Sequence, residues 1–366
     1  MMDHPNSARA ISHPASGTWR TIAPLATLIF LSPVLTELLA GIIRITTLWL
    51  LVPEMAVYGL ASVLIREAAR RFHRGWGSIL LLGIAYAVAE ECVILQTSLT
   101  PQFFPAGTSS FGWAAGVQWI WLTALVLYEG VYAIVLSIAL TELLFPDRRD
   151  DPWLSWRGIV IVIVVFLLGC VGVWWLWTHV GLQRFGPTTY QIPLLNIGLA
   201  LVAIVMFIAL GLGLPRRVGK PATKRAWSPW ILGLIAFIFG LFWWIMVGLP
   251  YIPASVFRGA SPLVPIVIGL IWAALALQVI RSLSSNRKSW QDRHRLALIF
   301  GAVLASMIGS TLGTLAASPL DKIGKLIFDL IAFILLVILA WLLRKRRQAN
   351  SPLRMTPAIF HDSATG

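Results

Sequence analysis

Charged residues are scarce in this chain. Asp, Glu, Lys and Arg make up 12% of the 366 residues, whereas hydrophobic residues make up 58%. Soluble globular domains usually carry about 25% charged residues, so this deficit excludes an arrangement of soluble domains. Apolar runs of about 18 to 25 residues recur instead, and each is long enough to cross a hydrocarbon core as a helix. The sequence therefore predicts an all-α, polytopic membrane helix bundle whose main partner is the lipid bilayer.

The chain has few cysteines and histidines, and their positions do not suit a disulfide or a metal site. The two cysteines, Cys92 and Cys170, both lie inside apolar runs, so a disulfide framework is not indicated. All six histidines lie in tails or connections, which removes the usual zinc designs, and no glycine-rich phosphate loop precedes a lysine. The sequence predicts no metal site and no cofactor.

Positive charge is in excess, with a formal net charge of +14. Lys and Arg form short clusters between the apolar runs rather than one basic face, so we expect no nucleic-acid partner. Twenty-four of the 29 basic residues fall in alternate connections. By the positive-inside rule, both termini are expected in the cytoplasm. The first apolar run, of about 22 residues, is longer than a signal-peptide core and is interpreted as a retained anchor.

Ten membrane helices are expected from the apolar runs. We divide the chain into an N-terminal tail (1–20), an acid-rich four-helix unit (21–145), a six-helix unit (146–343) and a basic C-terminal tail (344–366) that is expected to be disordered. The expected helices are Thr21–Ile43, Ile45–Ile65, Ser78–Leu95, Gly116–Leu144, Gly158–Trp177, Leu194–Leu214, Pro229–Leu249, Pro262–Ile280, Leu296–Leu315 and Lys325–Leu343.

Glutamate is concentrated in the first four expected helices, which hold six of the seven glutamates. An ionisable group in hydrocarbon costs at least about 2.5 to 3.5 kcal/mol, so a group of them predicts an ion, proton or substrate site. The alternative is that they are protonated acids that hold helices together by hydrogen bonds. The candidates, expected around one cavity, are Glu37, Glu54, Glu90, Glu91 and Glu129.

Neighbouring residues support this hypothesis. Pro33 precedes Glu37 by four residues and Pro53 directly precedes Glu54, so both helices are expected to kink beside an acid, as interrupted transporter helices do. Tyr86 precedes Glu90 by four residues and is expected to donate a hydrogen bond to it. Glu90 and Glu91 lie about 100° apart on an α-helix, so only one of them is expected to face the shared centre.

Two further acids, Glu142 and Asp329, are expected to stabilise the structure rather than to take part in the candidate site. Glu142 is expected at the cytoplasmic interface, beside Arg148 and Arg149. Asp329 is expected to pair with Lys325, one turn earlier in the last helix.

Several motifs in the first 150 residues resemble those of a group of uncharacterised bacterial multi-pass membrane proteins. This resemblance implies that the protein lies in the bacterial cytoplasmic membrane, but it implies no particular activity. The Glu90-Glu91 pair also resembles, more loosely, the CPBP intramembrane metalloproteases, although Leu95 stands at that family's arginine position and no expected helix holds a histidine. The motifs are Ser32–Leu39, Ile65–Arg71, Gly75-Trp76, Glu90-Glu91 and Glu142–Pro146.

These observations favour a membrane transporter or permease with a proton- or cation-linked carboxylate site. The first alternative is a protease-like membrane hydrolase in which Glu90 or Glu91 activates water. The second is a non-catalytic sensor or assembly partner. The substrate is not specified by any motif.

Overall fold

The chain forms a helical protein in the computed structural model, which describes residues 19–104, 111–186, 191–214, 226–284, 290–314 and 317–349. Within these residues, β-structure is limited to one short antiparallel hairpin of β1 (Trp113–Ala114) and β2 (Val117–Gln118). The all-α membrane class is therefore confirmed. Most of both expected tails, 1–18 and 350–366, lies outside the described residues.

Eight helices of the described chain are long and apolar enough to cross a membrane. The other two expected helices are present but do not meet this criterion. The first, Ile22–Leu38, is too short. The ninth begins with Asp292, Arg293 and Arg295, whose charges lower the hydropathy of its first turn. The eight are Ile45–Arg71, Trp76–Ile94, Trp119–Leu144, Trp156–Phe185, Leu194–Gly213, Pro229–Tyr251, Leu263–Ile280 and Pro319–Arg346.

The chain divides into two compact units that are interleaved in sequence. The first comprises residues 1–37, 48–218 and 246–269, and the second comprises residues 38–47, 219–245 and 270–366. The first unit contains all five candidate glutamates. The expected division at residue 145 stays a prediction about the organisation of the bundle.

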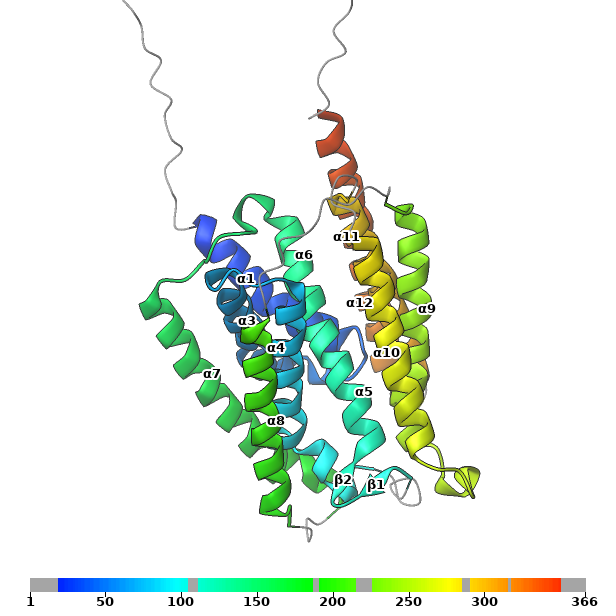
Figure 1. Cartoon of the computed structure of the whole chain (residues 1–366). Helices are drawn as coiled ribbons and strands as arrows, with labels where there is room; N and C mark the ends of the chain where they lie inside the picture. The colour runs from blue at the N-terminus through cyan, green and yellow to red at the C-terminus, as the bar shows by residue number, and fades with distance from the viewer. Residues whose placement is uncertain are drawn as a thin grey trace, which may run out of the picture. The chain divides into compact units, whose positions relative to one another are not determined.

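The α-helices of the first unit surround the candidate acids. In Figure 1, α4 and α8 run side by side, and α1 packs against α6. The bounds are α1 (Trp19–Pro33), α2 (Leu51–Glu54), α3 (Leu60–Arg71), α4 (Trp76–Ala89), α5 (Trp119–Glu129), α6 (Ser137–Leu144), α7 (Trp156–Leu176) and α8 (Leu194–Gly213).

The remaining α-helices belong wholly or mainly to the second unit. Both α9 and α10 cross a boundary between the units, whereas α11 and α12 lie within the second. The bounds are α9 (Pro229–Gly248), α10 (Leu263–Ser284), α11 (Asp292–Gly309) and α12 (Pro319–Ala349).

Short helical turns extend or connect these helices. Five are π-helical, namely Val34–Leu38, Met55–Gly59, Glu90–Ile94, Gly130–Leu136 and Trp177–Gly181. The 3₁₀ turns are Ile45–Leu50, Thr97–Leu99, Pro101–Phe103, Pro146–Arg148, Leu182–Phe185, Leu249–Tyr251, Ala254–Phe257 and Ser310–Thr314.

Burial separates the acid-bearing helices from the purely apolar ones. In the most apolar part of each helix, 44% of Ile45–Arg71, 67% of Trp76–Ile94 and 67% of Trp119–Leu144 is buried within the protein. The corresponding share is only 6% for Trp156–Phe185 and 11% for Leu194–Gly213. A helix that is apolar on every side needs a hydrocarbon surrounding, so the last two face lipid and the first three form the interior.

Glycine lets the interior helices approach closely. A Cβ atom added at Gly59 would lie 2.4 Å from the carbonyl oxygen of Ile29, and one added at Gly83 would lie 3.0 Å from the carbonyl oxygen of Gly130. Small residues at helix crossings allow backbone contact in membrane bundles. The Gly83–Gly130 crossing brings the middle of α4, two turns before Glu90, next to the end of α5, which carries Glu129.

Arg66 fixes one end of the interior helices. Its guanidinium is fully buried, lies 3.4 Å from a Glu142 oxygen and stacks 3.5 Å from the ring centroid of Trp153. It also donates hydrogen bonds to the carbonyl oxygens of Arg148 and Asp151, at 2.9 and 2.8 Å. Buried charges are retained where partners and hydrogen bonds compensate them.

Glu142 is part of this end, but its partners differ from those expected. It is 1% exposed and accepts hydrogen bonds at 2.6 Å from Arg70, rather than lying at an interface with Arg148 and Arg149. The reason is tertiary: α3 brings its own arginines against α6. The expected pair of Lys325 and Asp329 is confirmed, with 2.5 Å between Nζ and Oδ2.

Candidate functional site

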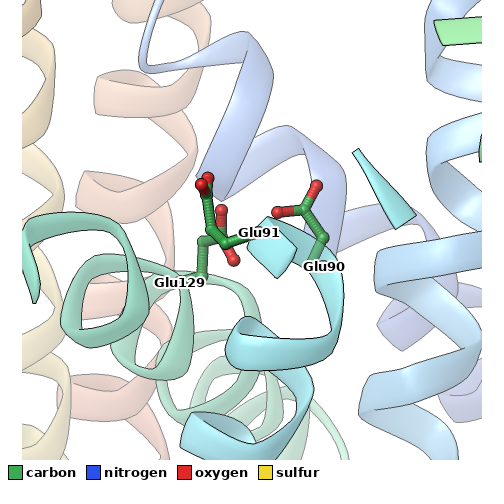
Figure 2. A group of neighbouring side chains, drawn as sticks. All are labelled: Glu90, Glu91 and Glu129. Atoms are coloured by element: carbon green, nitrogen blue, oxygen red, sulfur yellow. The ribbon is translucent and has the colours of Figure 1, made fainter. Parts of the chain in front are cut away.

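Three glutamates from two helices meet in the interior of the first unit. Glu90, Glu91 and Glu129 each offer a carboxylate oxygen, and these oxygens lie within 4.8 Å of one another. Figure 2 shows the three side chains, Glu90 and Glu91 from the turn after α4 and Glu129 from the end of α5. All three residues are at most 2% exposed. We call them the carboxylate cluster.

Each candidate acid lies in or directly beside a π-helical turn. Glu37 is inside Val34–Leu38, Glu90 and Glu91 open Glu90–Ile94, and Glu54 and Glu129 immediately precede the other two turns. A π-helical turn interrupts the regular backbone hydrogen bonding and is frequent at functional sites. Four separate π-helical turns thus coincide with the five candidate acids.

The expected helix interruptions at Pro33 and Pro53 coincide with two of these turns. Pro33 is the last residue of α1, and Val34–Leu38 follows it directly. Pro53 lies in α2, two residues before Met55–Gly59 begins. Proline lacks an N–H and cannot continue the α-helical hydrogen-bond ladder, which explains the change of helix type at both positions.

Glu91 is held by donors from a neighbouring turn and from α5. Its Oε2 atom accepts hydrogen bonds from Thr97 Oγ1 at 2.5 Å, Ser98 Oγ at 2.6 Å and Trp121 Nε1 at 3.0 Å. Three donors on one oxygen saturate the acceptor capacity of Oε2. These contacts fix the orientation of the Glu91 side chain.

Tyr58 connects the remaining members of the cluster. Its hydroxyl is 2.8 Å from Glu90 Oε1 and 3.5 Å from Glu129 Oε1. Glu37 also lies close enough to interact with this hydroxyl. A phenol has one proton to donate, so the acids around Tyr58 compete for a single hydrogen bond.

Glu37 and Glu54 flank the cluster. Glu37 is 8% exposed and interacts electrostatically with Glu91. Glu54 is half-buried and interacts electrostatically with Glu37 and Glu90, and its Oε2 atom is buried without a hydrogen-bond partner. All five candidates thus lie in one region of the first unit, while their role as an ion, proton or substrate site stays a prediction.

Two local expectations were wrong. The buried Tyr86 hydroxyl makes no hydrogen bond, and Tyr58 takes its expected place beside Glu90. Glu90 and Glu91 both join the cluster, although only one was expected to do so. The spacing from Tyr86 to Glu90 is α-helical as expected, since the Glu90 N–H bonds to the Tyr86 carbonyl oxygen, but Tyr58 from another segment reaches the Glu90 carboxylate. The second expectation assumed that the α-helix continues, whereas a π-helical turn starts at Glu90.

Sequence reasoning missed Tyr58 and the donors to Glu91. Tyr58 follows Glu54 by four residues, and Thr97, Ser98 and Trp121 stand in or near the connections after α4. A polar residue in an otherwise apolar run is a weak signal, because tyrosine and tryptophan also occur as ordinary bilayer-interface residues. Only the tertiary fold distinguishes these roles.

Among the residues that the structure describes, no basic side chain forms an ion pair with the cluster. In the described ranges, the ion pairs of Lys and Arg go to other acids, and none involves the cluster, Glu37 or Glu54. Two unit charges at the 4.8 Å limit repel by about 3 kcal/mol at an effective dielectric constant of about 20. The cluster therefore requires protons or a bound cation.

The buried acids and the apolar spans together define a multi-pass α-helical membrane protein with a polar interior. A model of the family described as "Uncharacterized membrane protein family" matches residues 26–345, and the chain belongs to this family. Comparisons with curated proteins and with solved structures gave no match. The expected membership of a group of multi-pass membrane proteins is confirmed, whereas the looser resemblance to the CPBP metalloproteases stays a prediction.

Proposed function

We propose that the protein carries protons or a cation across a bacterial cytoplasmic membrane as a transporter or permease, with the carboxylate cluster as its ion site. The observation that carries the proposal is the uncompensated charge of the cluster, whose carboxylates are 98 to 99% buried. Buried acids without basic partners are costly in a membrane and are typical of ion pathways and proton relays. Purely structural acids would be expected to pair with nearby arginines, as Glu67 and Glu142 do.

The helix geometry supports the same proposal. Interrupted helices beside a buried site are a recurrent feature of secondary transporters, because freed backbone groups can coordinate an ion. Here the interruptions occur at all five candidate acids and come from four different helical segments. The bacterial cytoplasmic membrane is proposed from the excess of basic residues in alternate connections together with the sequence motifs.

Ion flux through the full-length protein in proteoliposomes tests the proposal. Gradients of H⁺, Na⁺, K⁺, Mg²⁺ and Mn²⁺ are imposed in turn, and dyes inside the vesicles report the flux. We expect flux of at least one ion, and its loss in Glu90→Gln and Glu129→Gln, because the amide keeps the side-chain size but removes the charge.

The exposed acid Asp150 provides the control, since Asp150→Asn changes one charge outside the cluster. This variant should retain wild-type flux. Absence of flux for every gradient in the wild-type protein, or full flux in both glutamine variants, would overturn the proposal and favour acids that only join helices.

A further inference from the structure

The oxygens of the carboxylate cluster are close enough to share one ion. Oxygen ligands lie about 2.0 to 2.6 Å from Mg²⁺, Mn²⁺ or Ca²⁺, so ligand atoms around one ion are separated by up to about 5 Å. The three carboxylate oxygens lie within 4.8 Å of one another, inside that limit. We propose that Glu90, Glu91 and Glu129 bind one divalent cation of the oxygen-preferring class. The inference rests on the proposed function, because this cation would be the ion that the site recognises.

Unpartnered polar atoms point to a ligand at this position. Glu90 Oε2 and Glu129 Oε2 are buried and accept no hydrogen bond. The Tyr86 hydroxyl, on a side chain that is also nine-tenths buried, has no partner either, and its strongest electrostatic neighbours are Glu90 and then Glu129. A buried polar atom without a partner costs about 1 to 3 kcal/mol. A cation satisfies the two carboxylates, and a water on that cation satisfies the hydroxyl.

The surrounding donors have the form of an outer shell that orients metal ligands. The Thr97, Ser98 and Trp121 donors fix Glu91, and the Tyr58 hydroxyl contacts Glu90 at 2.8 Å. Hydrogen bonds from such residues orient ligating side chains and increase metal affinity. Two of the ligands belong to one π-helical turn, which holds them on adjacent residues.

The ligand type selects the class of ion. The group contains only carboxylates and no His or Cys, and oxygen donors of this kind suit Mg²⁺, Ca²⁺ and Mn²⁺ rather than Zn²⁺ or Cu²⁺. A divalent ion together with one proton balances three carboxylates. The three hydrogen bonds that Glu91 accepts all fall on Oε2, so its other oxygen, Oε1, is the one left to face an ion.

Mn²⁺ binding to the full-length protein in detergent tests the inference. The protein is treated with EDTA, dialysed and titrated with MnCl₂, while electron paramagnetic resonance measures free Mn²⁺. We expect one saturable site, displaced by Mg²⁺ or Ca²⁺, with affinity that falls as the pH falls because protons compete for the carboxylates. Glu129→Gln and Glu91→Gln should weaken binding by more than about 100-fold, and Tyr58→Phe by about tenfold.

Two controls keep the test independent of misfolding. Asp150→Asn should bind Mn²⁺ as the wild type does, since Asp150 is exposed and outside the cluster. Mn²⁺ should raise the thermal unfolding midpoint of the wild type and of Asp150→Asn, because a ligand that binds only the folded state stabilises it. No saturable binding by the wild type, or unchanged binding in both glutamine variants, would overturn the metal site.

Ion flux without Mn²⁺ binding would overturn this inference alone, whereas Mn²⁺ binding without flux would overturn the transport proposal alone.

Discussion

Two neighbouring tyrosines show how strongly a single hydroxyl depends on its surroundings. Tyr58 and Tyr86 pack edge to face, with ring centroids 5.6 Å apart, and both are nearly fully buried. Only Tyr58 has carboxylate partners. The same substitution, tyrosine to phenylalanine, therefore has opposite expected effects at the two positions.

In EDTA-treated protein, Tyr58→Phe should destabilise the fold by about 0.5 to 1.5 kcal/mol, because the buried hydrogen bond from the Tyr58 hydroxyl to Glu90 is lost. Tyr86→Phe should be neutral or slightly stabilising, because it removes a buried hydroxyl without a partner. Thermal unfolding in detergent measures both, and each variant is the control for the other. A larger loss for Tyr86→Phe than for Tyr58→Phe would contradict the hydrogen-bond assignment.

The stability of one end of the first unit depends on Arg66. It combines ion pairs to Glu67 and Glu142 with a stacked contact on Trp153, and its side chain is fully buried. Arg66→Gln would leave two buried carboxylates short of a cation, a change that typically costs about 3 to 5 kcal/mol. We expect a large fall in the unfolding midpoint or loss of detergent-stable protein.

Arg157 offers a matched control for Arg66, because it is exposed in the first turn of α7. Arg157→Gln should change stability by less than about 0.5 kcal/mol, as is usual for surface substitutions. Similar midpoints for the two variants would show that the Arg66 contacts contribute little to stability.

At the scale of elements, the close approach of helices predicts which glycines can be replaced. A Cβ atom at Gly59 would lie 2.4 Å from a backbone oxygen of α1, which cannot move without separating two helices, whereas one at Gly172 would meet nothing within 4 Å. Gly59→Ala should therefore destabilise the protein by about 1 to 3 kcal/mol. Gly172→Ala should be neutral or stabilising by up to about 1 kcal/mol, because alanine favours the helix.

Unfolding midpoints of both alanine variants, measured side by side in the same detergent, check the opposite signs. Gly59→Ala should also lower Mn²⁺ affinity, because it displaces the turn that carries Tyr58. A Gly59→Ala protein with wild-type stability would mean that α1 is free to shift at this crossing.

The elements divide clearly into those that sequence patterns predict and those that they do not. Apolar runs predict the membrane helices, because length and hydropathy are local properties of the chain. The acids Glu90, Glu91 and Glu129 were also found, because a carboxylate inside an apolar run is unusual. The π-helical turn at Glu90 has no such signature, so the meeting of Glu90 and Glu91 in one cluster could not be predicted. The pairing of Glu90 with Tyr58 joins distant segments, so it depends on the tertiary fold.

At the scale of the whole molecule, acidic and basic residues are distributed unequally, and the proposed function and the expected topology both rest on this distribution. Candidate acids are confined to the buried helices of the first unit, while the helices Trp156–Phe185 and Leu194–Gly213 are almost fully exposed to lipid. Basic residues lie mostly in the connections between the apolar runs or near the helix ends, with Arg66 and Lys325 as buried exceptions. Acids in the interior and bases towards the ends fit the proposed internal cation site.

The orientation of the chain stays a prediction, and the protein is well suited to its measurement. Both cysteines are free, so replacing Cys92 and Cys170 by alanine gives a background without thiols. Single cysteines are then introduced at Asp150 and Ser255, which are exposed residues in connections on opposite sides of the expected topology. The cysteine-free protein is the control for non-specific labelling.

We expect Asp150→Cys to react with a membrane-impermeant maleimide only in inside-out vesicles, and Ser255→Cys only in right-side-out vesicles. The physical reason is the excess of Lys and Arg in the connections that include residues 146–155, since basic segments near membrane helices are retained in the cytoplasm. The connection that contains Ser255 holds a single basic residue, Arg258. Labelling of both cysteines from one side would contradict an odd number of crossings between them, and the reverse pattern would place both termini outside the cytoplasm.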